Sequence, residues 1–208
     1  MNALLSLIYG FLVKIVDDIY DNNFMLKFKN LFVISLLLLT AYIIFFTKEL
    51  GISWILTLIA MGVLGLFHSP LIDILPWKLS VLLGYMGLFY HFSNIKDFLY
   101  NLNKKDFIFL ISYATIGCII MLIAETLITE EYSKRKLAIR LLATLLSVLA
   151  IIYKETLQKM INVSESVFDI FLWTRWVDIG YLSWSIIVMI YFLYFNKELN
   201  HEDNLSIS

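Results

Sequence analysis

Hydrophobic residues fall into long blocks along the chain, separated by short polar stretches. The blocks cover residues 3–16, 31–47, 51–67, 76–92, 107–128, 137–153 and 179–195. A helix of about 20 apolar residues crosses the hydrocarbon core of a bilayer, which is about 30 Å thick. Open sheets cannot sit in lipid, and barrel strands would alternate apolar with polar residues, whereas these blocks are continuous. The pattern therefore predicts an all-α, polytopic transmembrane helical bundle of about seven to eight spans.

Composition and charge narrow the classes of function. Of the 208 residues, 61% are hydrophobic and 16% are charged, whereas soluble domains are about half apolar and about a quarter charged. This excludes a soluble globular enzyme and favours one integral, multi-pass membrane domain over residues 1–200 with a polar tail over 201–208. The formal net charge of −1 gives no reason to expect a nucleic-acid partner. Because Cys118 is the only cysteine, we expect neither an intrachain disulfide nor a thiolate metal cluster.

Two segments allow more than one interpretation. Block 3–16 carries Lys14, so it spans the bilayer if Lys14 snorkels to the interface and the helix continues into the aspartates that follow. Otherwise this block lies partly in the interface. Segment 163–178 is less apolar than the blocks. It is an eighth span, a re-entrant hairpin or the start of one long helix that ends near Phe195.

Small residues and one charge pair bear on how the helices pack. Two pairs of glycines are spaced to permit close helix contacts: Gly62 with Gly65, and Gly84 with Gly87. Arg175 and Asp178 interrupt an aromatic, otherwise apolar segment, and their spacing allows an ion pair within one helix. The pair indicates a charge-neutralised interfacial helix or, alternatively, a polar lining at the end of a cavity.

The most specific local feature is a D-D-x-x-D cluster at the end of the first block, where Asp17, Asp18 and Asp21 share one helical face. Like charges at these spacings destabilise a helix by about 0.2–0.5 kcal/mol per pair unless a cation lies between them. A divalent cation that bridges carboxylates to a substrate diphosphate, usually Mg²⁺, would meet this need. The alternative is a polar cap that stops the helix at the interface.

A second acidic feature lies near the end of the fifth block. Glu125 is one turn inside that end, and Glu130 and Glu131 follow it. An ionisable residue at membrane depth is a functional candidate, although Glu125 can also snorkel to the surface or pair with a basic residue. If every block spans, the first and fifth helices run in the same direction. Both acidic features then lie at the same membrane face.

This arrangement resembles the UbiA superfamily of membrane prenyltransferases. In that family an N-D-x-x-D motif ends one helix, and a second acidic motif ends the helix four later. Residues 17–21 fit the first motif with Asp in place of Asn, and Glu125 follows Asp21 by 125 − 21 = 104 residues. Residues 136–139, K-L-A-I, resemble the family's T-L-(A/P)-V run with Lys in place of Thr. The family usually has a helix before the first motif, so the resemblance is to a divergent member without it.

The resemblance implies transfer of a prenyl group from an allylic diphosphate to a lipophilic acceptor, with Mg²⁺ as cofactor. It implies catalytic roles for Asp18, Asp21 and Glu125. The implied metal ligands are Asp17, Asp18 and Asp21 for Mg²⁺, with Glu125 and Glu130 for a second cation. The implied diphosphate-binding residues are Lys29, Lys134 and Arg135.

Two other classes of function stay open beside this enzyme. A noncatalytic membrane scaffold or lipid-binding subunit needs no motif. A small transporter needs ionisable residues inside its spans, yet blocks 31–47, 51–67 and 179–195 carry none in their interiors. A histidine metal site is not expected, because His68, His91 and His201 share no helical spacing.

Overall fold

A computed structural model describes residues 2–21, 25–47, 50–52, 54–58, 74–127 and 133–195 of the chain. This part is helical throughout, without strands, which confirms the all-α prediction. The helices are α1 (Asn2–Asp21), η1 (Leu26–Phe28), α2 (Lys29–Phe46), α4 (Leu75–Tyr90), α5 (Phe92–Tyr100), α6 (Lys104–Leu127), α7 (Lys134–Ile152), α8 (Lys154–Ile161) and α9 (Glu165–Ile190). The π-helical turn η3 (Tyr191–Phe195) extends α9.

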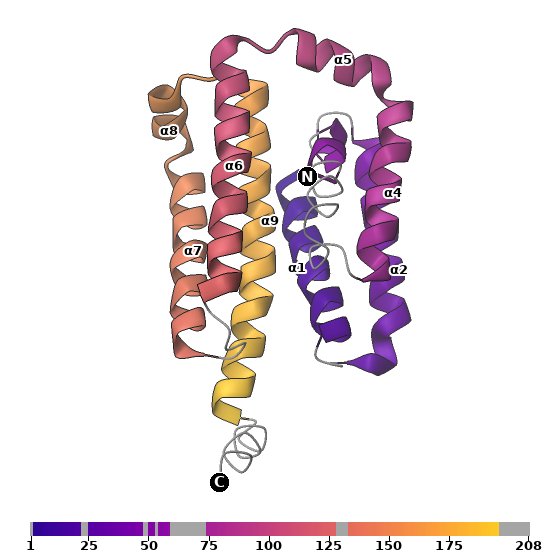
Figure 1. The fold of residues 1–208 in the computed structure, drawn as a ribbon, viewed down its shortest axis with the longest axis vertical. Coiled ribbons are helices and arrows are strands. Elements are labelled where there is room, and N and C mark those ends of the chain that lie inside the picture. The colour runs from indigo at the N-terminus through magenta and orange to yellow at the C-terminus, as the bar shows by residue number, and fades with distance from the viewer. Residues whose placement is uncertain are drawn as a thin grey trace.

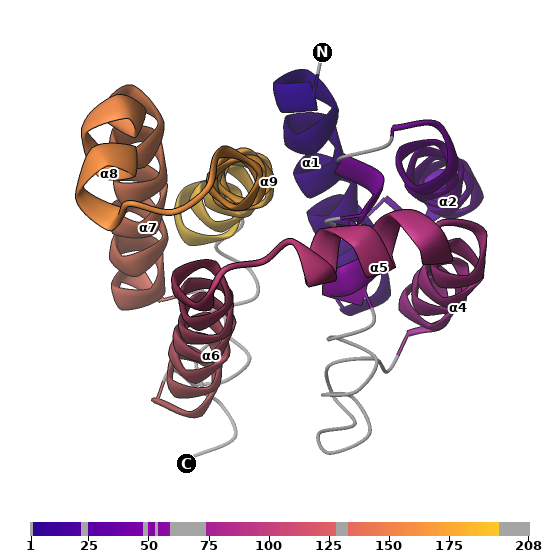
Figure 2. The ribbon, with the colours of Figure 1, turned by 90° about the horizontal axis from the view of Figure 1, so that it is seen from above.

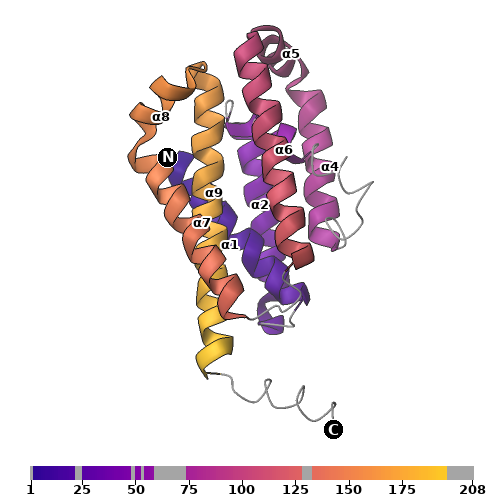
Figure 3. The ribbon, with the colours of Figure 1, turned by 60° about the vertical axis from the view of Figure 1, so that its left-hand side comes forward.

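The long helices lie side by side and run in two opposite directions. Figures 1 and 3 show α1, α6 and α9 running one way and α2, α4 and α7 running the other way. Helix contacts order them as α7, α9, α1, α2 and α4, so the first helix packs against the last. Viewed from above, α5 crosses from α4 to α6 (Figure 2).

Local capping explains where several helices begin and end. Ser133 caps α7 by accepting a hydrogen bond from the Lys136 amide at 3.1 Å. Asn162 ends α8 in the left-handed conformation, with φ of 54°. Asp106 is buried near the start of α6, and its Oδ1 accepts a hydrogen bond at 2.8 Å from the Ser164 amide, which precedes α9. Asp106 therefore ties the beginnings of α6 and α9 together.

The two ambiguous segments now have a structure. Residues 163–178 contribute to α9, one continuous helix extended by η3 to Phe195, which is the third of the three alternatives. Helix α1 continues through the aspartates to Asp21, as the spanning interpretation of the first block requires. Its Lys14 side chain, however, is buried and does not snorkel.

Glycines set the closest approaches between helices. A Cβ on Gly10 would collide with the Val177 carbonyl, and a Cβ on Gly180 would collide with the Leu7 carbonyl, so α1 and α9 cross almost backbone to backbone. On α4, a Cβ on Gly84 would lie 2.8 Å from the Leu58 Cβ, which confirms the close contact expected there. Gly87 likewise packs against Ile44 and Ile55. The other predicted pair, Gly62 and Gly65, lies outside the described residues.

Apolar side chains cover the outside of the bundle. On α7 the exposed residues recur at helical spacing: Ile139, Leu142, Leu145, Leu146, Leu149 and Ile152. On α2 they are Leu31, Ile34, Leu38, Tyr42 and Phe46. Several polar side chains are buried instead: Ser6, Lys14, Asp18, Thr40, Ser80, His91, Asp106, Ser147 and Ser185. Exposed apolar faces of this extent are typical of contact with lipid or with a partner protein.

Two described helices are long and apolar enough to cross a membrane. They are Leu26–Phe46, which joins η1 to α2, and Glu165–Tyr194, which joins α9 to most of η3. A third span is added if α7 and α8, which meet at a bend of 82°, count as one. These helices are compatible with a membrane protein. The larger number of spans expected from the sequence stays a prediction.

The α1–α9 crossing makes a direct prediction. Gly10→Ala and Gly180→Ala should each lower the free energy of unfolding by about 1–3 kcal/mol, the usual range for overpacking, although alanine favours helices. Thermal unfolding of the detergent-solubilised protein, followed by circular dichroism, measures the change. The matched control is Ala138→Val on the exposed surface of α7, which should change little. Unchanged stability in both glycine variants would contradict the close crossing.

Candidate functional site

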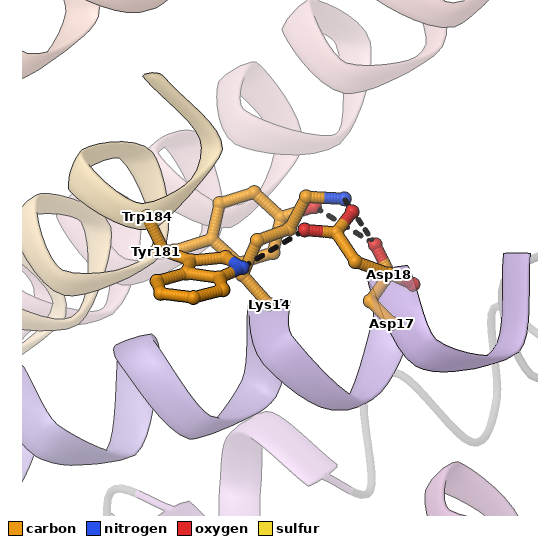
Figure 4. Close-up of polar contacts among 5 residues, drawn as sticks. All are labelled: Lys14, Asp17, Asp18, Tyr181 and Trp184. Carbon is orange, nitrogen blue, oxygen red and sulfur yellow. Dashed lines mark hydrogen bonds and ion pairs between the residues drawn. The ribbon is translucent and has the colours of Figure 1, made fainter. Parts of the chain in front are cut away.

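The polar centre of the molecule is built on the last turns of α1. Lys14, Asp17 and Asp18 lie at i, i+3 and i+4, so their side chains share one face of the helix. The Lys14 Nζ lies 2.7 Å from the Asp17 Oδ2 and 2.8 Å from the Asp18 Oδ1 (Figure 4). One ammonium group therefore bridges two carboxylates that are adjacent in the sequence.

Helix α9 completes this centre from the other side. The Trp184 Nε1 donates a hydrogen bond to the Asp18 Oδ2 at 3.0 Å, and the Tyr181 hydroxyl donates to the Asp17 Oδ2 at 3.5 Å. The Lys14 Nζ also lies 5.5 Å from the centre of the Tyr181 ring, within the range of a cation–π interaction. We call these five residues, all drawn in Figure 4, the Lys14 cluster.

Burial makes the ion pairing necessary. Lys14 is 6% exposed and Asp18 is 2% exposed, whereas the Asp17 side chain is 25% exposed. A buried unpaired charge costs several kcal/mol, so neither Lys14 nor Asp18 is stable here without the other. The polar-cap interpretation is therefore wrong for Asp18, which is a buried contact between helices.

The other predicted acidic residues are placed only by their backbone or not at all. Asp21 is the last residue of α1, and Glu125 lies in the last turn of α6, but their side chains lie outside the described part. Glu130 lies outside the described residues altogether. Helices α1 and α6 end at the same, lower end of the bundle in Figure 1. The expected convergence of their carboxylates stays a prediction.

The predicted diphosphate-binding residues begin two helices. Lys29 is the first residue of α2, and its Nζ lies 3.9 Å from the centre of the Tyr20 ring. Lys134 and Arg135 begin α7 and are exposed. Helices α2 and α7 both begin at the lower end in Figure 1, and no measured contact joins Lys29 to the other two residues.

Asp17 and Asp18 already have a cation. Lys14 takes one oxygen of Asp17 and one of Asp18, and Trp184 takes the second oxygen of Asp18. Over the residues that the structure describes, no group of three or more His, Cys, Asp or Glu side chains could hold a metal. Asp17 and Asp18 therefore meet Lys14 and Trp184 in the structure. Magnesium binding by Asp17, Asp18, Asp21, Glu125 and Glu130 stays a prediction.

A second polar contact joins α6 to α9. Arg175 and Asp178 form the predicted ion pair at 2.9 Å. Arg175 also donates a hydrogen bond to the Tyr113 hydroxyl, which lies 2.6 Å from the Thr174 Oγ1. The Phe171 ring packs edge-on against Tyr113, with 5.4 Å between the ring centres. The charge pair thus serves a contact between helices, consistent with the neutralised interpretation.

His91 also has a structural role. Its Nε2 donates a hydrogen bond at 2.8 Å to the Ile44 carbonyl, in the last turn of α2. Its Nδ1 lies 3.3 Å from the Asn94 amide nitrogen, which can donate to it. Carbonyls in the last turn of a helix lack a partner within that helix. His91 therefore satisfies the end of α2 and fixes α4 and α5 beside it.

Sequence reasoning missed the partners of the aspartates. Lys14 stands three and four residues before Asp17 and Asp18, so its spacing already allowed an ion pair with both aspartates. The sequence interpretation instead expected Lys14 to snorkel to the membrane interface. Tyr181 and Trp184 lie on α9, more than 160 residues away. No local pattern links them to α1. Comparison of the chain with protein-family models, with curated proteins and with solved structures gave no match.

The Lys14 cluster predicts a specific coupling between charges. Lys14→Met should lower the free energy of unfolding by about 3–5 kcal/mol, because it leaves a buried carboxylate without a counter-ion. Adding Asp18→Asn should recover part of this loss, so the double variant should be more stable than the sum of the two single effects. Chemical unfolding in detergent gives the three values.

Lys134→Met serves as the control, since this lysine is exposed at the start of α7, and it should leave stability nearly unchanged. Strictly additive effects of Lys14→Met and Asp18→Asn would show that the two side chains do not pair.

Proposed function

We propose that this chain is a noncatalytic, multi-pass integral membrane protein, a helical scaffold held together by the Lys14 cluster. The observation that carries the proposal is the ion pairing of Asp17 and Asp18 with Lys14, at 2.7 and 2.8 Å. Asp17 and Asp18, which are candidates for metal-dependent chemistry, also accept hydrogen bonds from Tyr181 and Trp184 of α9.

The distribution of side chains supports the membrane location. Apolar residues cover the outward faces of α2 and α7, and charged groups such as Lys14 and Asp18 are buried between helices. Helix α6 has 24 residues, which at about 1.5 Å per residue gives a length of about 36 Å. This exceeds the hydrocarbon thickness of about 30 Å. Together with the two opposite directions of the long helices (Figure 1), it supports a bundle of about seven to eight spans.

A second candidate function is membrane prenyl transfer. It is favoured by the topology, because α1 and α6 end where α2 and α7 begin (Figure 1). This topology assigns to one end of the bundle both acidic segments and the basic residues Lys29, Lys134 and Arg135. In this function the basic residues would hold the diphosphate of an allylic substrate, and Mg²⁺ would neutralise its charge. Lipid-facing helices would receive the lipophilic acceptor.

Reconstitution separates the two candidates. Wild-type protein in lipid nanodiscs, supplied with Mg²⁺, a radiolabelled allylic diphosphate and a membrane lipid extract, should form no labelled product above empty nanodiscs. Asp21→Asn protein should behave in the same way, and both should unfold at the same temperature with or without Mg²⁺. Product formation that requires Mg²⁺ and is lost in Asp21→Asn would overturn the scaffold proposal in favour of prenyl transfer.

A further inference from the structure

Two short helices differ in direction from the rest of the bundle. Helix α8 leaves α7 at a bend of 82°, and α5 runs across the bundle between α4 and α6 (Figures 1 and 2). Both lie toward the upper end in Figure 1, opposite the end where α1, α6 and α9 finish. Helices perpendicular to a membrane bundle at one end lie where the headgroup layer would be.

Helix α5 has three distinct sides. Ile95 is buried, and Phe98 packs with it on a core cluster that includes Ile44. Phe92 and Leu99, which are neighbours on one side of Ile95 around the helix, are 63% and 50% exposed. Lys96, Asp97 and Tyr100 are exposed on the remaining side. An exposed apolar strip therefore separates the core face from a polar face.

Helix α8 repeats this arrangement. Leu157 and Ile161 are partly buried, and Met160, on the same side of the helix, is 77% exposed. Glu155 and Lys159 are exposed on the other side. Because no residue of α8 is buried, packing on the bundle alone does not account for its apolar side.

We propose that α5 and α8 are in-plane helices that bind the phospholipid headgroup layer at this end of the bundle. Their apolar strips, with Phe92, Leu99 and Met160, lie about 5–10 Å into the boundary between headgroups and acyl chains. Lys96 and Lys159 reach outward to the lipid phosphates. This inference rests on the proposed membrane location.

Neighbouring side chains identify lipid as the occupant of these strips. The strip on α5 continues onto Phe89 and Tyr90 of α4, and the apolar side of α8 continues onto Ile152 and Tyr153, all of which are exposed. In a membrane bundle such outward faces contact lipid. Exposed tyrosines where α4, α5 and α7 end, Tyr90, Tyr100 and Tyr153, are typical of the aromatic belt at a membrane interface.

Fluorescent labelling at matched positions tests the inference. In a Cys118→Ser background, single cysteines replace Leu99 or Asp97 on α5, Met160 or Lys159 on α8, and Leu142 on the outward face of α7. Each variant carries an environment-sensitive nitrobenzoxadiazole label in phosphatidylcholine nanodiscs that contain lipids with shallow or deep quenchers. Labels at positions 99 and 160 should emit at shorter wavelength than labels at 97 and 159, and shallow quenchers should act on them several-fold more strongly than deep ones.

The label at position 142 separates the two possible failures. It should respond to deep quenchers. An aqueous spectrum at 142 would overturn the membrane proposal itself. A lipid spectrum at 142, with equally aqueous spectra at all four positions of α5 and α8, would overturn only the in-plane assignment, as would deep quenching at 99 and 160.

Discussion

The structure depends on a lysine that cannot reach water. Lys14 lies inside the contact between α1 and α9, where its ammonium group bridges Asp17 and Asp18. The close crossing at Gly10 and Gly180 permits this contact, because side chains larger than hydrogen would separate the two helices. With the helices this near, Trp184 reaches Asp18 and completes the pairing. Close packing and charge neutralisation therefore require each other, as expected where desolvation makes an unpaired charge costly.

The remaining helices are arranged around this contact between the first and last helices of the bundle. Helix α7 packs on α9, α2 packs on α1, and α4 packs on α2. Because α1 and α9 are far apart in sequence, their contact closes the whole described chain into one bundle. Two polar contacts nearer the start of α9, from the Ser164 amide to Asp106 and from Arg175 to Tyr113, attach α6 to the same helix. Polar groups thus connect helices inside the bundle, while apolar groups face outward, the arrangement that a lipid solvent favours.

Sequence patterns predicted the helices better than their contacts. Continuous apolar blocks indicated helices, because in lipid only helices and closed barrels satisfy the backbone and barrel strands would alternate apolar with polar residues. The spacing of Arg175 and Asp178 was enough to predict their ion pair. The spacing of Lys14 also allowed an ion pair with Asp17 and Asp18, which the sequence interpretation did not predict. Whether Lys14 turns inward or snorkels, however, depends on Trp184 and Tyr181, more than 160 residues away. The glycine crossing was missed for the same reason, since Gly10 and Gly180 have a partner only once the bundle is assembled.

The central claim is that Lys14, rather than a metal ion, is the cation of Asp17 and Asp18. Solid-state NMR in lipid bilayers tests it most directly, by measuring dipolar couplings between the ¹⁵N-labelled lysine Nζ and the ¹³C-labelled aspartate Cγ. The account predicts cross-peaks from Lys14 to both Asp17 and Asp18 that are unchanged when Mg²⁺ is added. A Lys14 signal without carboxylate contacts, or cross-peaks that disappear as Mg²⁺ binds, would contradict the account.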